Sequence, residues 1–234
     1  MGRIRQARQE EGSSPRVGAL STQVYQQLRE DVLAGRLRPG ERLRVQALSK
    51  RFEIANSPIR EALNRLLSDE IVVFEDQKGF RVAPVSESEL RDILHTRTML
   101  DSLALTEAIR RADVAWEEAL VLALHRLSRA TRHVAPASPT ANTEWERLHR
   151  NFHTTLTSGC GSRLLSRISE QLLDYSERYR LLAADGIPER NELDEHRAIV
   201  DACVARDAAR ATKLLEQHYG QTFEIIMKSA GAPP

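Results

Sequence analysis

Apolar residues recur at helical spacing in the first third of the chain. A first helix is predicted to run from an N-cap at Ser21 to Gly35, a residue type favoured at helix C-caps. Its apolar side is formed by Val24, Leu28, Val32 and Leu33. A turn at 37–40 and a short extended piece at 42–44 lead to a second predicted helix over 45–51.

The next helix, predicted over 58–69, has one apolar and one polar side. Ser57 is expected to cap it and Pro58 to take the first position, where a missing N–H costs nothing. The apolar side consists of residues at helical spacing: Ile59, Ala62, Leu63, Leu66 and Leu67. The other side presents short or forked hydrogen-bonding groups, namely Asn56, Ser57, Arg60 and Asn64. We therefore expect one side to be buried and the other to face solvent.

Two short apolar runs, 71–74 and 80–82, flank a polar turn at 75–79 and predict a β-hairpin. Three helices followed by a hairpin make a winged helix-turn-helix. Such a fold places the amino end of its recognition helix in the DNA major groove, where arginine suits guanine and asparagine suits adenine. The polar side of the 58–69 helix is therefore the candidate DNA-reading surface. The same pattern, taken alone, is equally typical of an ordinary solvated helix.

Beyond Pro84 the strand signals disappear and helical patterns continue. Ser86 and Glu89 form a capping box that opens a long helix. Six helices are predicted, over 86–112, 114–132, 143–157, 163–183, 188–206 and 208–229. The predicted fold is therefore mainly α, with an N-terminal winged helix-turn-helix and a C-terminal antiparallel six-helix bundle. The expected domains are a flexible tail over 1–17, the winged helix-turn-helix over 18–84 and the helical domain over 85–230.

Charge is unevenly divided between these parts. Residues 1–84 contain 15 Lys and Arg against 11 Asp and Glu, a net charge of +4. The remainder contains 19 against 22, a net charge of −3, and the two sum to the +1 of the whole chain. A basic module joined to an acidic one favours a polyanion such as double-stranded DNA as a partner.

Composition narrows the cellular setting. The chain has no run of 18 apolar residues and no apolar leader, so we expect no membrane span, no export signal and a cytoplasmic protein. Its two cysteines, Cys160 and Cys203, lack the spacing of a disulfide framework or a zinc ribbon. Both are expected to be buried thiols.

Four histidines in the second domain are candidate metal ligands. His149 and His153 are four residues apart and share one face of a helix, so both imidazoles can reach a single ion. His196 and His218 lie eleven residues before and eleven after the turn at Asp207, which brings them level in an antiparallel hairpin. Four imidazoles suit Zn, Ni or Cu better than Mg or Ca. The alternative is that each is an ordinary hydrogen-bonded histidine, as we expect for His95, His125 and His133.

The first domain resembles the GntR family of bacterial regulators. The matching stretches are Gly35-Arg36-Leu37-Arg38-Pro39-Gly40-Glu41-Arg42-Leu43, Ala47-Leu48, Ser57-Pro58-Ile59-Arg60-Glu61-Ala62-Leu63-Asn64-Arg65-Leu66 and Gly79-Phe80-Arg81-Val82. The resemblance implies that Arg60 reads a base and that the wing at Lys78 and Gly79 approaches the minor groove. It also adds Gln46 as a DNA contact. The family usually has Ser-Arg-Thr where this chain has Ala55-Asn56-Ser57, so a different operator is expected.

The second domain resembles the FCD ligand-binding domain of the FadR-like branch, in its shorter, VanR-like, six-helix version. The matching pieces are Arg97 with Asp101, Phe152-His153, Glu195-His196-Arg197-Ala198-Ile199, Asp207-Ala208 and His218. The resemblance implies a metal held by His153, His196 and His218, and an effector carboxylate bound by Arg97. The family has an Asp or Asn where this chain has His149, which changes the charge of the metal site.

Three functions are consistent with these features. The leading hypothesis is a homodimeric transcriptional regulator that binds a palindromic operator and responds to a small carboxylate bound near Zn or Ni. Repression is the expected mode, with activation as the alternative. In the second, the metal itself is the signal. The third, a metallohydrolase, is disfavoured because the chain has no HExxH motif and no acidic general base paired to the histidines. We therefore expect a regulator and not an enzyme.

Overall fold

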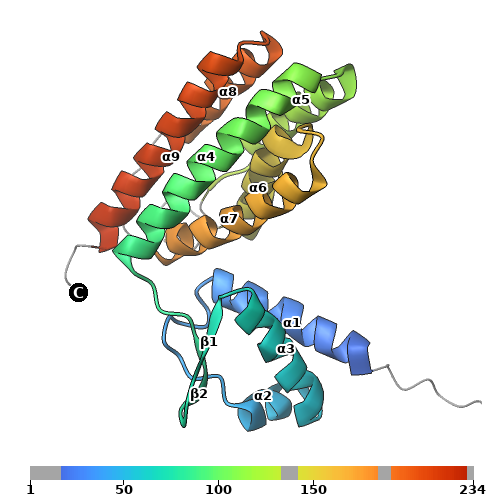
Figure 1. The fold of residues 1–234 in the computed structure, drawn as a ribbon, viewed down its shortest axis with the longest axis vertical. Helices are drawn as coiled ribbons and strands as arrows, with labels where there is room; N and C mark the ends of the chain where they lie inside the picture. Colours follow the sequence, from blue (N-terminus) through green and yellow to red (C-terminus); the bar gives the residue numbers. More distant parts are fainter. Residues whose placement is uncertain (1–16, 133–141, 184–190, 231–234) are drawn as a thin grey trace, which may run out of the picture. The chain divides into compact units, whose positions relative to one another are not determined.

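The computed structural model describes residues 17–132, 142–183 and 191–230. The chain divides into two compact units, with the second beginning its helical bundle after Ala83 (Figure 1). Within these described ranges, the first unit holds three helices and a hairpin, and the second holds six helices. This is the predicted mainly α architecture. The predicted tail over 1–17 lies outside the described residues except for Val17.

The first unit is built from α1 (Val17–Leu33), α2 (Val45–Phe52) and α3 (Asn56–Ser68). Its core consists of fully buried apolar residues from α1, α3 and the hairpin: Val24, Leu28, Ile59, Ala62, Leu63, Leu66, Val72 and Val82. The predicted cap at Ser21 is wrong. Helix α1 begins earlier, and Ser21 is buried inside it with its hydroxyl donating back to the carbonyl of Gly18 at 3.2 Å. That local bond satisfies the hydroxyl within the helix.

The hairpin consists of β1 (Val72–Glu75) and β2 (Gly79–Val82), paired antiparallel with Phe74 opposite Phe80. Its turn needs a positive φ at Gly79, which is 79°. The extended piece predicted at 42–44 pairs with β2, since the Leu43 amide donates to the Phe80 carbonyl at 2.9 Å. The wing is therefore fixed to the chain that leads into α2.

The second unit is the predicted six-helix bundle. Its helices are α4 (Glu87–Arg111), α5 (Val114–Ser128), α6 (Thr143–Ser158), α7 (Arg163–Leu182), α8 (Glu192–Val204) and α9 (Ala208–Ala230). Two helix ends differ from the prediction. Helix α5 ends at Ser128 and not at 132. Helix α8 begins at Glu192, and residues 188–190 lie outside the described residues. No helix within the described ranges combines the length and apolar character needed to cross a bilayer.

Helix α4 packs against α6, α7 and α9, and therefore runs through the middle of the bundle. The largest apolar cluster lies around α4, α5, α6, α8 and α9 and contains the fully buried Leu105, Leu120, Phe152, Ile199 and Leu215. Cys160 and Cys203 are free and buried, as predicted. Burial raises the pKa of the Cys203 thiol to about 12, so it is an unreactive core residue.

The capping box at the start of α4 is formed in half. The Ser86 hydroxyl accepts a hydrogen bond from the Glu89 amide at 3.1 Å, as predicted. The reciprocal bond is replaced, because the Ser86 amide donates to the hydroxyl of Tyr179 on α7 at 3.1 Å and that hydroxyl donates to the Glu89 carboxylate. The first turn of α4 is therefore tied to α7.

Candidate functional site

The polar side of α3 is exposed along its length. Asn56, Ser57, Arg60 and Asn64 all face solvent, while Ile59 and its apolar neighbours are buried. Two details differ from expectation. The helix begins at Asn56 after an N-cap at Ala55 that makes no side-chain cap bond, so Ser57 is not the cap. Leu67 is 37% exposed and not part of the core.

Helix α3 is anchored to α1 from behind. The Tyr25 hydroxyl on α1 donates to Asp69, directly after α3, at 2.6 Å. The Arg65 guanidinium lies 4.0 Å from the centre of the Tyr25 ring and donates to Thr22 at 3.1 Å. Arg65 thus serves packing between helices, while Arg60, on the same helix, remains available to a partner.

The other candidate DNA contacts lie on α2 and on the wing. Gln46 is exposed near the start of α2. Lys78 is exposed in the hairpin turn, with its ammonium 2.8 Å from the Glu75 carboxylate, and this hydrogen bond lowers the pKa of Glu75. Open space surrounds the position that a Cβ would take at Gly79, so a phosphate or sugar could approach its backbone.

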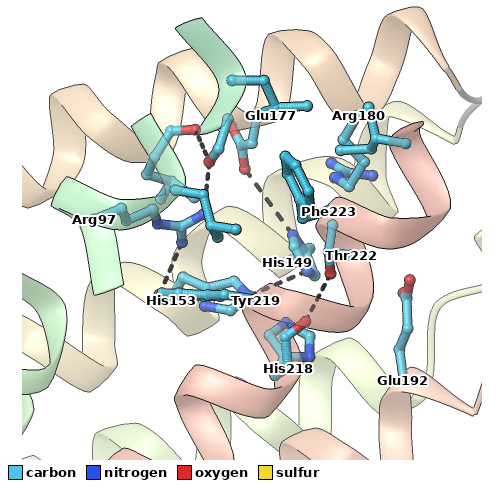
Figure 2. Close-up of a pocket in the computed structure, with 15 residues that line it drawn as sticks. Arg97, His149, His153, Glu177, Arg180, Glu192, His218, Tyr219, Thr222 and Phe223 are labelled. Carbon is cyan, nitrogen blue, oxygen red and sulfur yellow. Dashed lines mark hydrogen bonds and ion pairs between the residues drawn. The ribbon is translucent and has the colours of Figure 1, made fainter. Parts of the chain in front are cut away.

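The four predicted histidines converge inside the second unit. His149 and His153 come from α6, His196 from α8 and His218 from α9, and all four are buried. One nitrogen of each lies within 4.8 Å of the others, and Figure 2 shows three of the imidazoles along one side of a pocket. Spacing on one helix and register between two helices thus bring together residues that are far apart in the sequence.

The state of the imidazoles favours metal binding. Burial, together with neighbouring positive groups, lowers the pKa of His149 and of His153 well below the usual value, so both rings are neutral at pH 7. Their Nε2 atoms lie 3.2 Å apart, and the Nδ1 of His153 has no hydrogen-bond partner within the described residues. Neutral imidazoles that face each other closely are the form of histidine that coordinates transition metals.

Distance supports the same donor set. A tetrahedral Zn site with Zn–N bonds of about 2.0–2.1 Å has nitrogens about 3.4 Å apart. The His149–His153 pair already meets this spacing at 3.2 Å, and one nitrogen each of His196 and His218 lies within 4.8 Å of the others. A set made of nitrogen donors alone suits Zn, Ni or Cu and suits Mg or Ca poorly.

A small pocket open to solvent lies beside the histidines, with a volume of about 40 Å³ for the centre of a water-sized molecule. One wall is polar, and besides the histidines it includes Arg97, Ser176, Glu177, Arg180 and Thr222 (Figure 2). The lining also includes apolar residues, among them Leu90, Leu94, Phe223 and Ile226. A ligand with one charged end and a small apolar body matches this lining.

Arg97 lines the pocket and is already engaged. Its guanidinium donates to Asp101 at 3.1 Å, Ser176 at 2.6 Å and Tyr219 at 3.0 Å. Burial opposes its charge, but the neighbouring Tyr219 and Asp101 outweigh burial and raise the pKa of Arg97. Since a guanidinium has five N–H donors, two remain to contact a ligand.

Sequence reasoning missed Arg180. This buried residue of α7 pairs with Glu146 on α6, its guanidinium lies 5.3 Å from the centre of the Trp145 ring, and it lines the pocket. A signal was present, because Arg180 lies seven residues after the buried Leu173 and therefore falls on the inward side of α7. A charged residue on an inward helix face marks a polar interior.

Two family models match the chain. Residues 20–82 match the model for bacterial regulatory proteins of the gntR family, and residues 92–221 match the FCD domain. The chain is also 36% identical over 211 residues to the HTH-type transcriptional regulator BphR of Paraburkholderia xenovorans, covering 90% of this chain and 86% of that protein. The chain belongs to the GntR family.

Other members share the same two-part organisation. The GntR chain is 34% identical over 212 residues to the HTH-type transcriptional repressor GlaR of Escherichia coli K12, covering 88% of this chain and 94% of GlaR. The structure of E. coli McbR/YncC matches its fold with a TM-score of 0.75 at 22% identity, over 91% of this chain and 99% of that one. The family model describes bacterial regulatory proteins, and BphR and GlaR are transcriptional regulators, so this GntR protein is a DNA-binding transcriptional regulator and not a metallohydrolase.

Proposed function

We propose that this GntR regulator is a cytoplasmic homodimeric repressor whose operator affinity is controlled by a small carboxylate bound near a divalent metal, Zn or Ni. Residues 18–84 would bind a palindromic operator and residues 85–230 would hold the metal and the effector. The observation that carries the proposal is the convergence of four buried imidazoles beside a pocket lined by two buried arginines. Some FCD domains bind metals, which supports the same assignment.

The charged side chains of the pocket are paired with opposite charges, so a bound metal would add uncompensated positive charge. The lining contains two arginines and two glutamates. Arg97 is paired with Asp101, and Arg180 is paired with Glu146. Glu177 and Glu192 are paired with arginines that lie outside the lining. None of the four ligands in the cluster is a carboxylate. A divalent ion there would supply a Lewis acid whose charge the ligands do not neutralise. A carboxylate effector would therefore be the group that balances the charge.

This chain's own residues would then orient the acid. The two free N–H groups of Arg97 suit a carboxylate oxygen, and the hydroxyls of Ser176 and Thr222 lie in the same lining. The apolar residues of the lining would contact the rest of the molecule and exclude water. In this arrangement Arg97 would bind the effector and would keep its hydrogen bond to Asp101.

On DNA, α3 would supply the base contacts and α2 and the wing the flanking contacts. Arg60 suits guanine, while Asn56, Asn64 and Gln46 offer amides that suit adenine. In a two-fold dimer the two recognition helices would meet successive major grooves, and effector binding would change their spacing or mobility. Exposure of all these side chains supports the proposed roles.

The test combines DNA, metal and acid. Binding to the DNA upstream of the protein's own coding region is measured with metal-loaded and chelator-treated protein, each with and without a panel of organic acids. The proposal expects release by an acid only when Zn²⁺ or Ni²⁺ is present. Release controlled by metal without any acid would favour the metal as the signal, a reading supported by Arg97 being already engaged. Absence of sequence preference for any duplex would refute the regulator mechanism proposed.

A further inference from the structure

One imidazole of the histidine cluster is held from behind by a carboxylate. The Nδ1 of His218 on α9 lies 2.8 Å from an Oε2 of Glu195 on α8. The His218 side chain is 4% exposed and the Glu195 side chain 24% exposed, so this hydrogen bond lies at the edge of the bundle interior. Because carboxylates accept hydrogen bonds at ordinary pH, the proton of this bond belongs to the Nδ1 of His218.

We propose that Glu195 is a positioning residue for the metal site: it accepts the Nδ1–H of His218 and so keeps the lone pair of the ring on Nε2, the nitrogen that would bind the metal. The inference rests on the proposed metal function. The two ring nitrogens of a neutral histidine differ, and the hydrogen bond made by one decides which carries the lone pair. Carboxylates behind metal-bound histidines also fix ring orientation and increase ligand basicity.

Local sequence explains how α8 supplies two parts of the site. Glu195 directly precedes His196, so adjacent residues on α8 provide one predicted ligand and the group that orients another. Helices α8 and α9 pack together after the turn at Asp207, which sets Glu195 level with His218. Sequence spacing paired His196 with His218 but gave no role to Glu195.

The histidines on α6 are held differently. The Nδ1 of His149 is 4.0 Å from the nearest Glu177 oxygen, beyond hydrogen-bond distance, and that glutamate is bonded to Arg150 at 3.0 Å. His149 instead lies against the Trp145 ring, with the ring centres 4.7 Å apart. His149 is thus oriented by packing, whereas His218 is oriented by a charged acceptor.

Two substitutions separate hydrogen bonding from charge. Glu195→Gln keeps an oxygen that can accept from Nδ1, while Glu195→Ala removes the acceptor. In full-length protein titrated with Zn²⁺ against a competing chelator, we expect Glu195→Ala to lose about 10- to 100-fold in affinity and Glu195→Gln to lose less. Asp201→Asn, which alters an exposed carboxylate of the same helix, is the matched control and is expected to change nothing.

A second measurement needs no metal. Nitrogen chemical shifts of His218 in the metal-free protein report its tautomer, and we expect the Nδ1–H form in the wild type and in Glu195→Gln. Glu195→Ala should populate the Nε2–H form. Unchanged Zn²⁺ affinity and an unchanged tautomer in folded Glu195→Ala would overturn the inference. Wild-type protein that binds no metal, yet shows this tautomer shift, would sink the proposed metal function and retain the orienting role of Glu195.

Discussion

Two helices of this regulator carry functional candidates four residues apart, with opposite surroundings. On α3, Arg60 and Asn64 face solvent, whereas on α6, His149 and His153 are enclosed by the bundle. The exposed pair keeps its hydration, and gains energy only when a partner arrives. The buried pair has lost its hydration, so its chemistry is set within the fold. Burial, and not spacing, decides which kind of site a helix face makes.

The largest effect is expected from the buried Arg97, in contrast to the exposed Arg60. Arg97→Ala removes the cation beside Asp101 inside the bundle, and breaking a buried pair of this kind costs about 3–5 kcal/mol. Denaturant unfolding measures the loss. The added change Asp101→Asn should recover part of it, because no unpaired charge then remains buried. A stable Arg97→Ala protein would show that the enclosed pair contributes no more than a surface pair. Arg97→Lys is the better variant for testing effector response.

Removing one ligand should affect metal binding more than removing its orienting group. His196→Ala is expected to lower Zn²⁺ affinity by more than about 100-fold, since loss of outer groups alone costs 10- to 100-fold. Metal content of the purified protein and competition titration report the change. His125→Ala, which alters an exposed histidine on α5, should leave metal binding intact. Equal metal content in the two variants would remove His196 from the site.

On the exposed side, Arg60→Ala should leave the fold intact and cost about 1–3 kcal/mol of operator discrimination. Fluorescence anisotropy with operator and random duplexes measures it. Arg65→Ala, on the same helix, should lower stability through the lost contact with Tyr25 and leave discrimination unchanged. Equal loss on both duplexes would make Arg60 a phosphate contact.

The most gradual effect is expected from acid, because it accumulates with each pH unit. Burial lowers the pKa of His149 and His153 in the folded protein, so above the usual value of about 6.5 both states are neutral and stability does not change. Below it the unfolded chain binds protons that the native state excludes. The metal-free protein should then lose about 1.4 kcal/mol per pH unit for each of the two imidazoles. Unfolding midpoints between pH 7 and 5 test this, and a flat profile would contradict neutral burial.

Helical periodicity was sufficient to predict the fold. Each predicted helix and both strands are present, because each has an apolar face at regular spacing that the core buries. Apart from the end of α5, which comes at Ser128, the main errors lie at helix starts, where capping residues mislead: Ser21 bonds within its own helix, and α3 begins before Ser57. Hydroxyl groups satisfy themselves in either position, so the sequence leaves that choice open.

The sequence predicted the part of the site that depends on the register of residues along helices. It did not predict the part that depends on how the helices pack against one another. The four histidines follow from helical spacing and one antiparallel hairpin. The partners of Arg97 come from α4, α7 and α9, and Arg180 depends on Glu146, 34 residues away. Such contacts require the relative rotation of three helices, which no local pattern specifies.

Helix α7 reaches both the ligand pocket and the start of the bundle. Ser176, Glu177 and Arg180 line the cavity, while Tyr179 holds the Ser86 amide and the Glu89 carboxylate where the chain enters α4. The helix that lines the pocket is therefore bonded directly to the first turn of α4 through one hydroxyl group. Any ligand that displaces α7 would act on the first residues of the helical bundle through Tyr179.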